Sequence, residues 1–386
     1  MSFAKRIIVY LVLIVIVSGG TFAVAFYSSP SYPVEESTYF NIVGIPSLQR
    51  LGLDGSGVKV AVIDSGIDAS LPIFRTGQVV AWKDFVGSGA SPYDDNRHGT
   101  AVASIIAGGT TSLRDAEGST VSDFTGVAPG VNLIVAKVSN STDQIRDCQV
   151  VSDAIHWVMD YHPDIINLSI WCGYTPNGQS VVDQAVDWAY SQGALVVTIA
   201  GNYGDKSGTI TAPGDAVDAL TVGATNVYGT SIQPYSGVGP TADGRIKPDL
   251  VAPSGTDPAT YPGMTAVSNN GILYYDWEGT SFAAPLVVGI AALLKQWNPH
   301  LTAANLTSIL EDSAHHLGSA GQNDVYGYGL VNASAAFTMV AGVSPESIVL
   351  TRSLQNAVYG LVASVLLVAA AEVIARRRPS PRRRGR

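Results

Sequence analysis

The 386 residues are enough for one large α/β domain or two ordinary domains, and 46% of them are hydrophobic against 14% charged. The formal net charge of -9 is unevenly spread: nine of the 22 basic residues lie at the two ends, so 13 basic residues between positions 7 and 375 face all 31 acidic ones. An acidic body of this kind argues against nucleic acid as a partner.

The chain begins with an apolar run at residues 7–26, which follows Lys5 and Arg6. A short basic stretch before an apolar run is typical of a secretory signal sequence, and Ala23 and Ala25 supply a small-x-small cleavage pattern. The run is also long enough to cross a bilayer. A cleaved signal sequence and an uncleaved anchor therefore both remain open.

Short apolar runs alternate with helix-like stretches through the body of the chain. The apolar runs are continuous, as in strands buried on both faces of a parallel sheet, and lie at 58–63, 131–138, 165–170, 194–199 and 219–224. The helix-like stretches are 99–107, 149–161, 180–192, 281–297 and 302–314. This alternation predicts an α/β fold in one domain, with a doubly wound, mostly parallel sheet and helices on both faces.

Three motifs carry the residue types of an activated serine nucleophile. Asp64 lies in VAVIDSGID, His98 in RHGTAVA and Ser281 in GTSFAAP. A serine hydroxyl needs a base within hydrogen-bond reach, and the base needs an acid that holds its tautomer. Each residue alone has a simpler structural role, as a turn aspartate, a structural histidine or a helix cap. Together, in the order Asp-His-Ser, they predict a catalytic triad.

On these motifs the sequence resembles the subtilisin-like serine proteases, or subtilases, over about residues 41–337. The resemblance implies a subtilisin-like fold and a serine-type endopeptidase. In that reading Asp64 orients His98, and His98 serves as general base and then general acid. Ser281 forms the acyl-enzyme. The predicted sheet agrees with this resemblance. Asp64 directly follows a predicted strand, and ligands of open parallel sheets bind outside the carboxyl ends of the strands.

Asn202, in IAGNYG, matches the asparagine whose side-chain amide forms the oxyanion hole in this family. The simpler interpretation is an asparagine in a Gly-Asn turn. The sequence also departs from the family pattern at Arg97, Ala101, Phe282 and Leu286, where glycine, histidine, methionine and histidine are usual. Arg97 and Ala101 are not part of the triad, so they do not put the predicted activity in doubt. Phe282 and Leu286 depart from the pattern conservatively in bulk and less so in polarity.

By the same resemblance, an extended substrate pairs with the backbone of Ser169, Ile170 and Trp171. Trp171 stands where the family usually has glycine. It either narrows the pocket for the residue before the scissile bond (P1), stacks on a substrate side chain, or folds into the wall. Thr211, in the far wall of that pocket at 209–214, replaces a smaller expected residue. We expect a preference for a modest apolar P1 residue.

The two cysteines, Cys148 and Cys172, flank the groove for the P4 side chain in the same alignment. In an extracellular body they form either a disulfide that stiffens this groove or two buried free thiols. Sequence alone leaves both open.

The predicted chemistry requires no cofactor and no catalytic metal. Asp115, Glu117 and Asp123 cluster in a polar insertion after the His98 helix, but their spacing is not that of a calcium loop. A structural calcium ion is therefore not supported by the spacing, and we interpret the insertion as a solvated loop.

About 15 residues separate Ala25 from FNIVGIPSLQRLGLDGSG, the first segment that resembles the family. Many secreted subtilases carry a folding propeptide of domain size in this place. The expectation is that the chain folds unaided or that a separate folding assistant or inhibitor protein takes part.

A second apolar segment, 357–375, is followed by seven arginines within 376–386. The positive-inside rule predicts a transmembrane helix with a cytoplasmic tail and the body outside. The alternatives are an amphipathic helix packed on the protease and a tail removed by a sortase-type transpeptidase. The expected boundaries are a signal sequence or N-terminal anchor at 1–25, a linker at 26–40, a peptidase domain at 41–337, a stalk at 338–356, a transmembrane helix at 357–375 and an Arg-rich tail at 376–386.

The sequence thus predicts an extracellular serine endopeptidase tethered to the cell membrane, acting on peptide or protein substrates. One alternative is a catalytically silent binding or scaffold protein with the same fold at the cell surface. A second is the related acid-active carboxyl proteases, which share a Gly-Thr-Ser helix start. They use glutamate where this chain has His98, which argues against them.

Overall fold

The structure is a computed structural model that describes residues 34–377, apart from 143, 144, 146, 174–176, 205 and 256–262. The chain divides into two units, each described here by itself: Tyr32–Pro345, and Met1–Ser31 together with Glu346–Arg386. The N-terminal segment predicted at 1–25 and most of the predicted arginine-rich tail lie outside the described residues.

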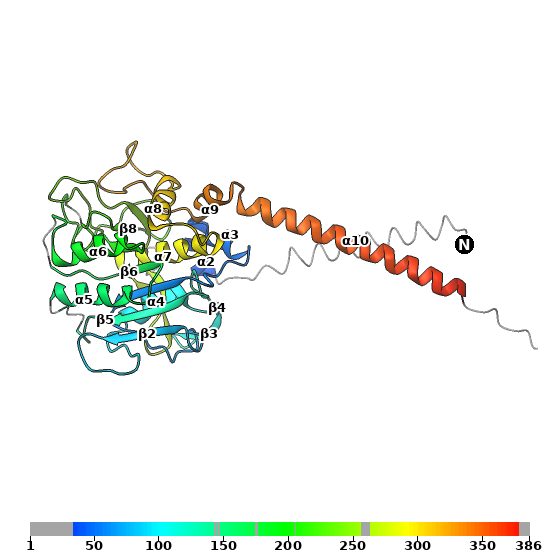
Figure 1. The fold of residues 1–386 in the computed structure, drawn as a ribbon, viewed down its shortest axis with the longest axis horizontal. Helices are drawn as coiled ribbons and strands as arrows, with labels where there is room; N and C mark the ends of the chain where they lie inside the picture. Colours follow the sequence, from blue (N-terminus) through cyan, green and yellow to red (C-terminus); the bar gives the residue numbers. More distant parts are fainter. Residues whose placement is uncertain are drawn as a thin grey trace, which may run out of the picture. The chain divides into compact units, whose positions relative to one another are not determined.

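Seven parallel strands form the central sheet of the first unit, in the order β2-β5-β1-β6-β7-β8-β9 (Figure 1). Their bounds are β1 Lys59–Asp64, β2 Val79–Asp84, β5 Asn132–Lys137, β6 Ile165–Leu168, β7 Leu195–Ile199, β8 Leu220–Thr225 and β9 Leu250–Pro253. The five strands expected from continuous apolar runs are all present, and the predicted doubly wound α/β fold is confirmed.

Helices cover both faces of this sheet. The bounds are α4 His98–Ala107, α5 Cys148–Met159, α6 Val181–Ser191, α7 Thr280–Trp297 and α8 Ala303–Asp312, so all five predicted helices are present. Helices α5 and α6 pack against each other, and α4 packs against α7 (Figure 1). Local sequence starts α6, where Ser180 and Asp183 exchange side-chain and backbone hydrogen bonds in a capping box.

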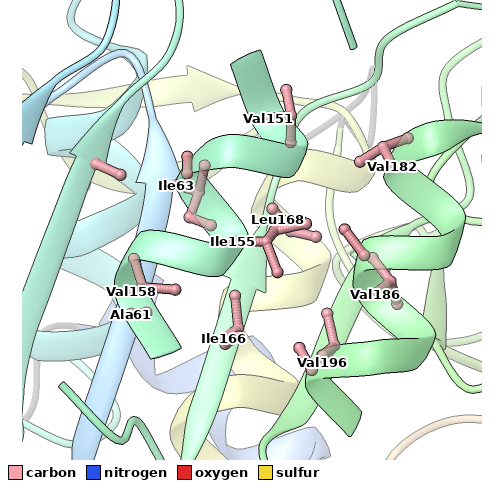
Figure 2. Close-up of a cluster of buried hydrophobic side chains, with 14 of the residues drawn as sticks. Ala61, Ile63, Val151, Ile155, Val158, Ile166, Leu168, Val182, Val186 and Val196 are labelled. Atoms are coloured by element: carbon pink, nitrogen blue, oxygen red, sulfur yellow. The ribbon is translucent and has the colours of Figure 1, made fainter. Parts of the chain in front are cut away.

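The core follows the period of two along each strand. Ala61 and Ile63 of β1 point toward α5 and α6, where they meet Ile155 and other aliphatic side chains (Figure 2). Val60 and Val62 are equally buried but belong to the opposite face of the strand. Each such side chain contributes about 1.5–3 kcal/mol when fully buried. Burial on both faces therefore fixes the register of the strands that carry the site.

A second sheet of four strands has the order β10-β11-β3-β4. Its strands are β3 Thr111–Asp115, β4 Thr120–Phe124, β10 Met264–Val267 and β11 Ile272–Trp277. The polar insertion predicted as a solvated loop instead forms the hairpin of β3 and β4. Asp115 Oδ1 accepts the Ser119 N–H at 2.7 Å within that hairpin. The β11 strand leads directly into the turn before α7.

The segment predicted as a linker, 26–40, is helical from Val34, because α2 spans Val34–Ile42. Tyr39 and Phe40 are buried, so this part of the segment belongs to the packed unit. The short helix α3, Ile45–Gln49, follows, and the Ala333 N–H of α9, Ala333–Ala341, donates to the Val43 carbonyl at 2.7 Å.

The described part of the second unit, from Glu346 to Arg377, lies in helix α10, Pro345–Arg377. It covers much of the predicted stalk as well as the predicted transmembrane segment, so most of the stalk is helical. Within α10, Pro345–Ala370 is long and apolar enough to cross a membrane, and its most apolar 18-residue stretch is not buried. Helix α7 meets the same criteria of length and composition but is mostly buried in the first unit.

Candidate active site

Asp64 and His98 form a hydrogen-bonded pair at the carboxyl end of β1. Asp64 is the last residue of the strand and is fully buried, and its Oδ1 lies 2.8 Å from His98 Nδ1. The Ser65 N–H donates to the same oxygen at 2.7 Å. The His98 side chain keeps 17% of its surface exposed. A carboxylate that accepts from Nδ1 fixes the tautomer in which Nε2 can act as a base.

Asp64 and His98 can approach each other because residue 99 is glycine and has no side chain. A Cβ at this position would overlap the Gly66 carbonyl oxygen and lie 3.1 Å from Asp64 Oδ1. The Gly99 N–H donates to Ser65 Oγ at 2.8 Å. Glycine after the histidine therefore lets the start of α4 approach the end of β1.

Asp94 organises the loop that presents the histidine. Its Oδ1 accepts the N–H groups of Asn96 and Arg97 at 3.0 and 2.9 Å and the Ser65 hydroxyl at 3.0 Å. Its Oδ2 accepts from the backbone and hydroxyl of Thr100 at 2.9 and 2.7 Å. These bonds hold Arg97 at φ 90°, a left-handed conformation that costs a non-glycine residue energy. Sequence reasoning missed Asp94, although an acid four residues before the histidine is a usable signal.

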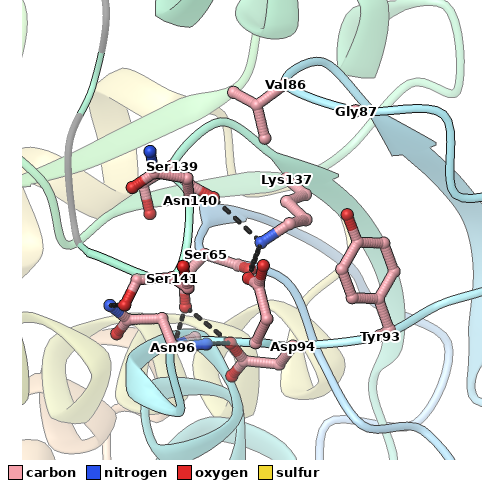
Figure 3. Close-up of polar contacts among 12 residues, drawn as sticks. Ser65, Val86, Gly87, Tyr93, Asp94, Asn96, Lys137, Ser139, Asn140 and Ser141 are labelled. Carbon is pink, nitrogen blue, oxygen red and sulfur yellow. Dashed lines mark hydrogen bonds and ion pairs between the residues drawn. The ribbon is translucent and has the colours of Figure 1, made fainter.

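Lys137 is a fully buried cation beside the same loop. It ends β5 in register with Asp64, and its Nζ donates to the carbonyls of Ser65 and Ser139 at 2.6 and 2.9 Å and to Asp95 Oδ1 (Figure 3). All three ammonium donors are therefore used. The Tyr93 ring lies 4.9 Å from Nζ. A buried charge is tolerated when it is paired and fully hydrogen-bonded. Lys137 therefore links the end of β5 to Ser65, which follows β1, and to Asp95 in the loop before His98, which we call the catalytic loop.

Ser281 is the second residue of α7, where backbone N–H groups have no carbonyl of the helix to bond. Its Oγ donates to the Ser169 carbonyl at 3.0 Å, and Ser169 Oγ donates to the Ser281 carbonyl at 2.9 Å. Asn167 Nδ2 donates to Ser169 Oγ at 3.0 Å. The ring centroids of His98 and Phe282 lie 5.3 Å apart, which brings the histidine to the start of α7.

The turn before Ser281 is held by buried hydroxyl groups. Gly279 has φ 115°, and its N–H donates to the Tyr235 hydroxyl at 3.0 Å. Ser254 Oγ donates to the Gly279 carbonyl at 2.6 Å, and the Tyr235 hydroxyl donates to the Ser254 carbonyl at 3.1 Å. Burial raises the pKa of Tyr235 to about 12, so the phenol stays protonated. Neither Tyr235 nor Ser254 was predicted, because each lies in a segment whose sequence looks like an ordinary loop.

Asn202 is oriented by the residue before Ser281. Its Oδ1 accepts both the N–H and the hydroxyl of Thr280, each at 2.9 Å. The amide Nδ2 lies on the side of Gly279, 3.1 Å from where a Cβ would be. Asn202 as a whole is exposed.

The predicted substrate-binding residues differ in how far they are exposed. Strand β6 ends at Leu168, and the segment after it contains Ser169, Ile170 and Trp171. The Ile170 side chain lies in the hydrophobic core, so only its backbone can meet a substrate. Thr211 is also buried and packs under Gly201. Trp171 is exposed and contacts Tyr203, a residue that sequence reasoning missed.

The two cysteines are free thiols in this structure. Cys148 Sγ donates to the Cys172 carbonyl at 2.7 Å, which places the pair together as the alignment implied. Burial raises the pKa of both thiols. Among the residues that the structure describes, no group of three or more His, Cys, Asp and Glu side chains is arranged to hold a metal ion.

Comparison with known proteins agrees with this geometry. A model of the subtilase family matches residues 55–329. The chain is 32% identical over 303 residues to serine protease AprX of Bacillus subtilis (strain 168), a match that covers 73% of this chain and 66% of AprX. It is 36% identical over 296 residues to subtilisin Savinase of Lederbergia lenta, covering 76% of this chain and 96% of that protein. A crystal structure of a cold adapted subtilisin-like serine proteinase matches with a TM-score of 0.58 at 27% identity, covering 73% of this chain and 90% of the other.

Proposed function

The chain belongs to the subtilase family of serine endopeptidases, and from this premise we propose that it hydrolyses peptide bonds through an acyl-enzyme on Ser281. The observation that carries the proposal is the buried 2.8 Å bond between Asp64 and His98 Nδ1, with the His98 ring packed at the start of the helix that carries Ser281. These are the acid, base and nucleophile of one reaction, supplied by three separate elements.

The acid–base steps follow from this arrangement. Ser281 Oγ attacks the scissile carbonyl carbon while His98 Nε2 takes the hydroxyl proton, and Asp64 stabilises the imidazolium that forms. His98 then gives the proton to the leaving amine as the C–N bond breaks. Water attacks the acyl-enzyme with the same base, and Ser281 regains its proton when the acid product leaves.

The developing oxyanion needs donors on the other side of the carbonyl. In this proposal the Ser281 N–H and Asn202 Nδ2 supply them. Thr280 holds Asn202 Oδ1 through two hydrogen bonds, so the amide does not have to reorient when charge develops. Donors fixed before the reaction stabilise the transition state more than the ground state.

We also propose that α10 anchors the enzyme in a membrane with the catalytic unit outside. The support is the length and apolar character of Pro345–Ala370, most of which is exposed to solvent. Seven arginines follow between positions 376 and 386, as the positive-inside rule expects of a cytoplasmic end. Substrates would then be peptides or proteins at the outer surface.

The catalytic proposal is tested by labelling the purified full chain with a fluorophosphonate probe, beside Ser281→Ala and His98→Ala. We expect the parent alone to be labelled and to cleave casein. A folded parent that takes no label and leaves casein intact would contradict the proposal and favour the silent scaffold.

The membrane proposal is tested by expressing the full chain and washing the membranes with alkaline carbonate. We expect the parent to stay with the membranes. Val365→Arg, which puts a charge in the middle of the apolar stretch, should shift the protein to the soluble fraction. A parent released by carbonate would contradict the anchor. Met339→Arg is a control at an exposed site before α10.

A further inference from the structure

Two exposed aromatic side chains, Trp171 and Tyr203, belong to the two segments that adjoin the nucleophile and the oxyanion amide. Trp171 lies two residues after Ser169, whose carbonyl accepts the Ser281 hydroxyl. Tyr203 directly follows Asn202, the proposed oxyanion donor. One ring therefore extends from the segment beside the nucleophile, and the other from the segment that carries the oxyanion amide.

A third segment connects these two segments. The Cys172 N–H donates to the Ala212 carbonyl at 3.0 Å, and the Thr211 N–H donates to the Ala200 carbonyl at 3.3 Å. Residues 211–212 thus bridge residue 172 on one side and residue 200 on the other. Residues 169–172, 200–203 and 211–212 are thus joined by backbone hydrogen bonds beside Ser281. Following the resemblance to the subtilases, we take the first two segments as the walls and the third as the floor of the P1 pocket.

The floor is filled by the Thr211 side chain. Thr211 is 1% exposed, and a Cβ on Gly201 would overlap its Oγ1. Gly201 has φ 92°, a left-handed conformation suited to glycine. Because Gly201 has no side chain, its backbone can lie directly against Thr211. Thr211 therefore lies directly against the wall segment that also carries Tyr203.

The rings of Trp171 and Tyr203 meet each other. Their centroids lie 5.2 Å apart with an interplanar angle of 86°, an edge-to-face contact. Such pairs attract each other beyond the apolar area they bury. Because the side chains remain 43% and 50% exposed, the contact is made in the open part of the site. A side chain that enters between the walls has to pass under the pair or separate it.

We infer that Trp171 and Tyr203 form an aromatic gate over the P1 pocket and restrict cleavage to small P1 residues such as glycine, alanine and serine. A small side chain fits beneath the joined rings. A phenylalanine or leucine side chain has to part them and then meets the threonine floor. This inference rests on the proposed function, since it specifies the substrate class of the same site.

The test compares kcat/KM of the full chain in detergent on succinyl-Ala-Ala-Pro-Xaa p-nitroanilides with alanine, leucine or phenylalanine as Xaa. We expect alanine to exceed phenylalanine at least 10-fold in the parent. Trp171→Ala should raise the ratio of the phenylalanine value to the alanine value at least 10-fold. Tyr203→Ala should act in the same direction, and the double variant should add little, because either substitution opens the same contact.

Trp188→Ala is the matched control, since Trp188 is an exposed tryptophan on α6 that stacks on His156 with centroids 4.4 Å apart. Its Xaa preference should equal that of the parent. A parent that cleaves phenylalanine as well as alanine, or a Trp171→Ala variant that loses phenylalanine cleavage, would overturn the gate. The second result would make Trp171 a stacking surface for aromatic P1 residues.

Fluorophosphonate labelling separates this inference from the proposed function. Labelled variants with an unchanged Xaa preference refute the gate but leave the serine protease intact. A folded parent without label or peptide cleavage refutes the proposed function itself.

Discussion

The acid–base side and the substrate side of this active site are built in different ways. On the acid–base side Asp64, Asp94 and Lys137 are buried, and each holds a neighbouring segment through several hydrogen bonds. On the substrate side Trp171 and Tyr203 are exposed and contact each other through their rings. Proton transfer requires atoms fixed to within a fraction of an ångström, whereas recognition tolerates side chains that move. The two sides should therefore fail differently when they are altered.

The largest effect is expected from Asp64→Asn, which tests whether the buried side works through a fixed tautomer. An asparagine can offer its NH₂ to Nδ1 and turn the imidazole into the wrong tautomer, so kcat/KM should fall about 10⁴-fold. Peptide anilide hydrolysis measures the loss. Asp68→Asn, at a carboxylate of the same motif that accepts from the Ser70 backbone and hydroxyl, should keep activity within threefold. A loss below 10-fold at Asp64 would contradict the assignment.

Asn202→Ala tests the point where the two sides join, because Asn202 serves the reaction but adjoins Tyr203. We expect kcat to fall about 10²–10³-fold with KM little changed, the size known for loss of such a donor in a subtilisin. Thr280→Val should cost less, since it removes one of the two bonds to Oδ1 and keeps the backbone bond. An Asn202→Ala defect confined to KM would place the residue in substrate binding instead.

Lys137→Met tests whether the acid–base side depends on its buried lysine. The change leaves the carbonyls of Ser65 and Ser139 without their donor, and each buried unsatisfied group costs about 1–3 kcal/mol. We expect kcat to fall roughly 10-fold at nearly constant KM, and the Tm of the Ser281→Ala protein to drop by several degrees.

Lys83→Met, at an exposed cation over the Phe85 ring, is the matched control for Lys137 and should change neither quantity. If Lys137→Met lowers Tm while kcat stays at the parent value, Lys137 supports the fold without positioning the catalytic loop.

The sequence predicted those parts of the fold whose signal is local. Five strands of the main sheet are buried on both faces and read as continuous apolar runs. Strand β2 has a mixed burial pattern, and β9 has four residues that end in Pro253, so neither carries such a run. The second sheet depends on pairing between β11 and β3, which lie far apart in the chain. A strand that is half exposed gains its identity from such a partner, which a local pattern does not contain.

The site divides in the same way. Asp64, His98, Ser281 and Asn202 were found because each lies in a motif of several fixed neighbours. Lys137 was missed because a lysine after LIVA looks like the polar end of a strand, and its burial arises from loops more than 40 residues away. Tyr203 was missed because its significance lies in a ring contact with Trp171. Sequence therefore identified the groups that are proposed to react more readily than the groups that are proposed to position or select.

Asp183 and Asp215 form a second pair of buried acids, apart from Asp64 and Asp94. Asp215 Oδ2 accepts the Gly178 N–H at 2.7 Å, and Asp183 Oδ2 accepts the Ser180 N–H at 2.8 Å. Burial, aided by the neighbouring Asp215 charge, raises the pKa of Asp183 to about 7, and burial also raises the pKa of Asp215. Asp187 adds to the repulsion at Asp183, while the Arg245 guanidinium offsets part of it at Asp215.

Both acids therefore bind protons more tightly in the folded chain than at their ordinary pKa of 3.8. Between about pH 4 and pH 7 the folded state holds more protons than the unfolded state, so the free energy of unfolding falls as pH rises. The Tm of the Ser281→Ala protein should fall between pH 5 and pH 8. In the protein that also carries Asp215→Asn, this fall should be smaller by roughly 5 °C.

Glu311, whose pKa burial raises to about 7, contributes a slope of the same sign, so only the difference between the two proteins reports on the pair. Equal slopes in both would contradict the raised pKa values of Asp183 and Asp215. A smaller fall in the Asp215→Asn protein would show that protonation of this buried pair stabilises the segments that it holds at Gly178 and Ser180.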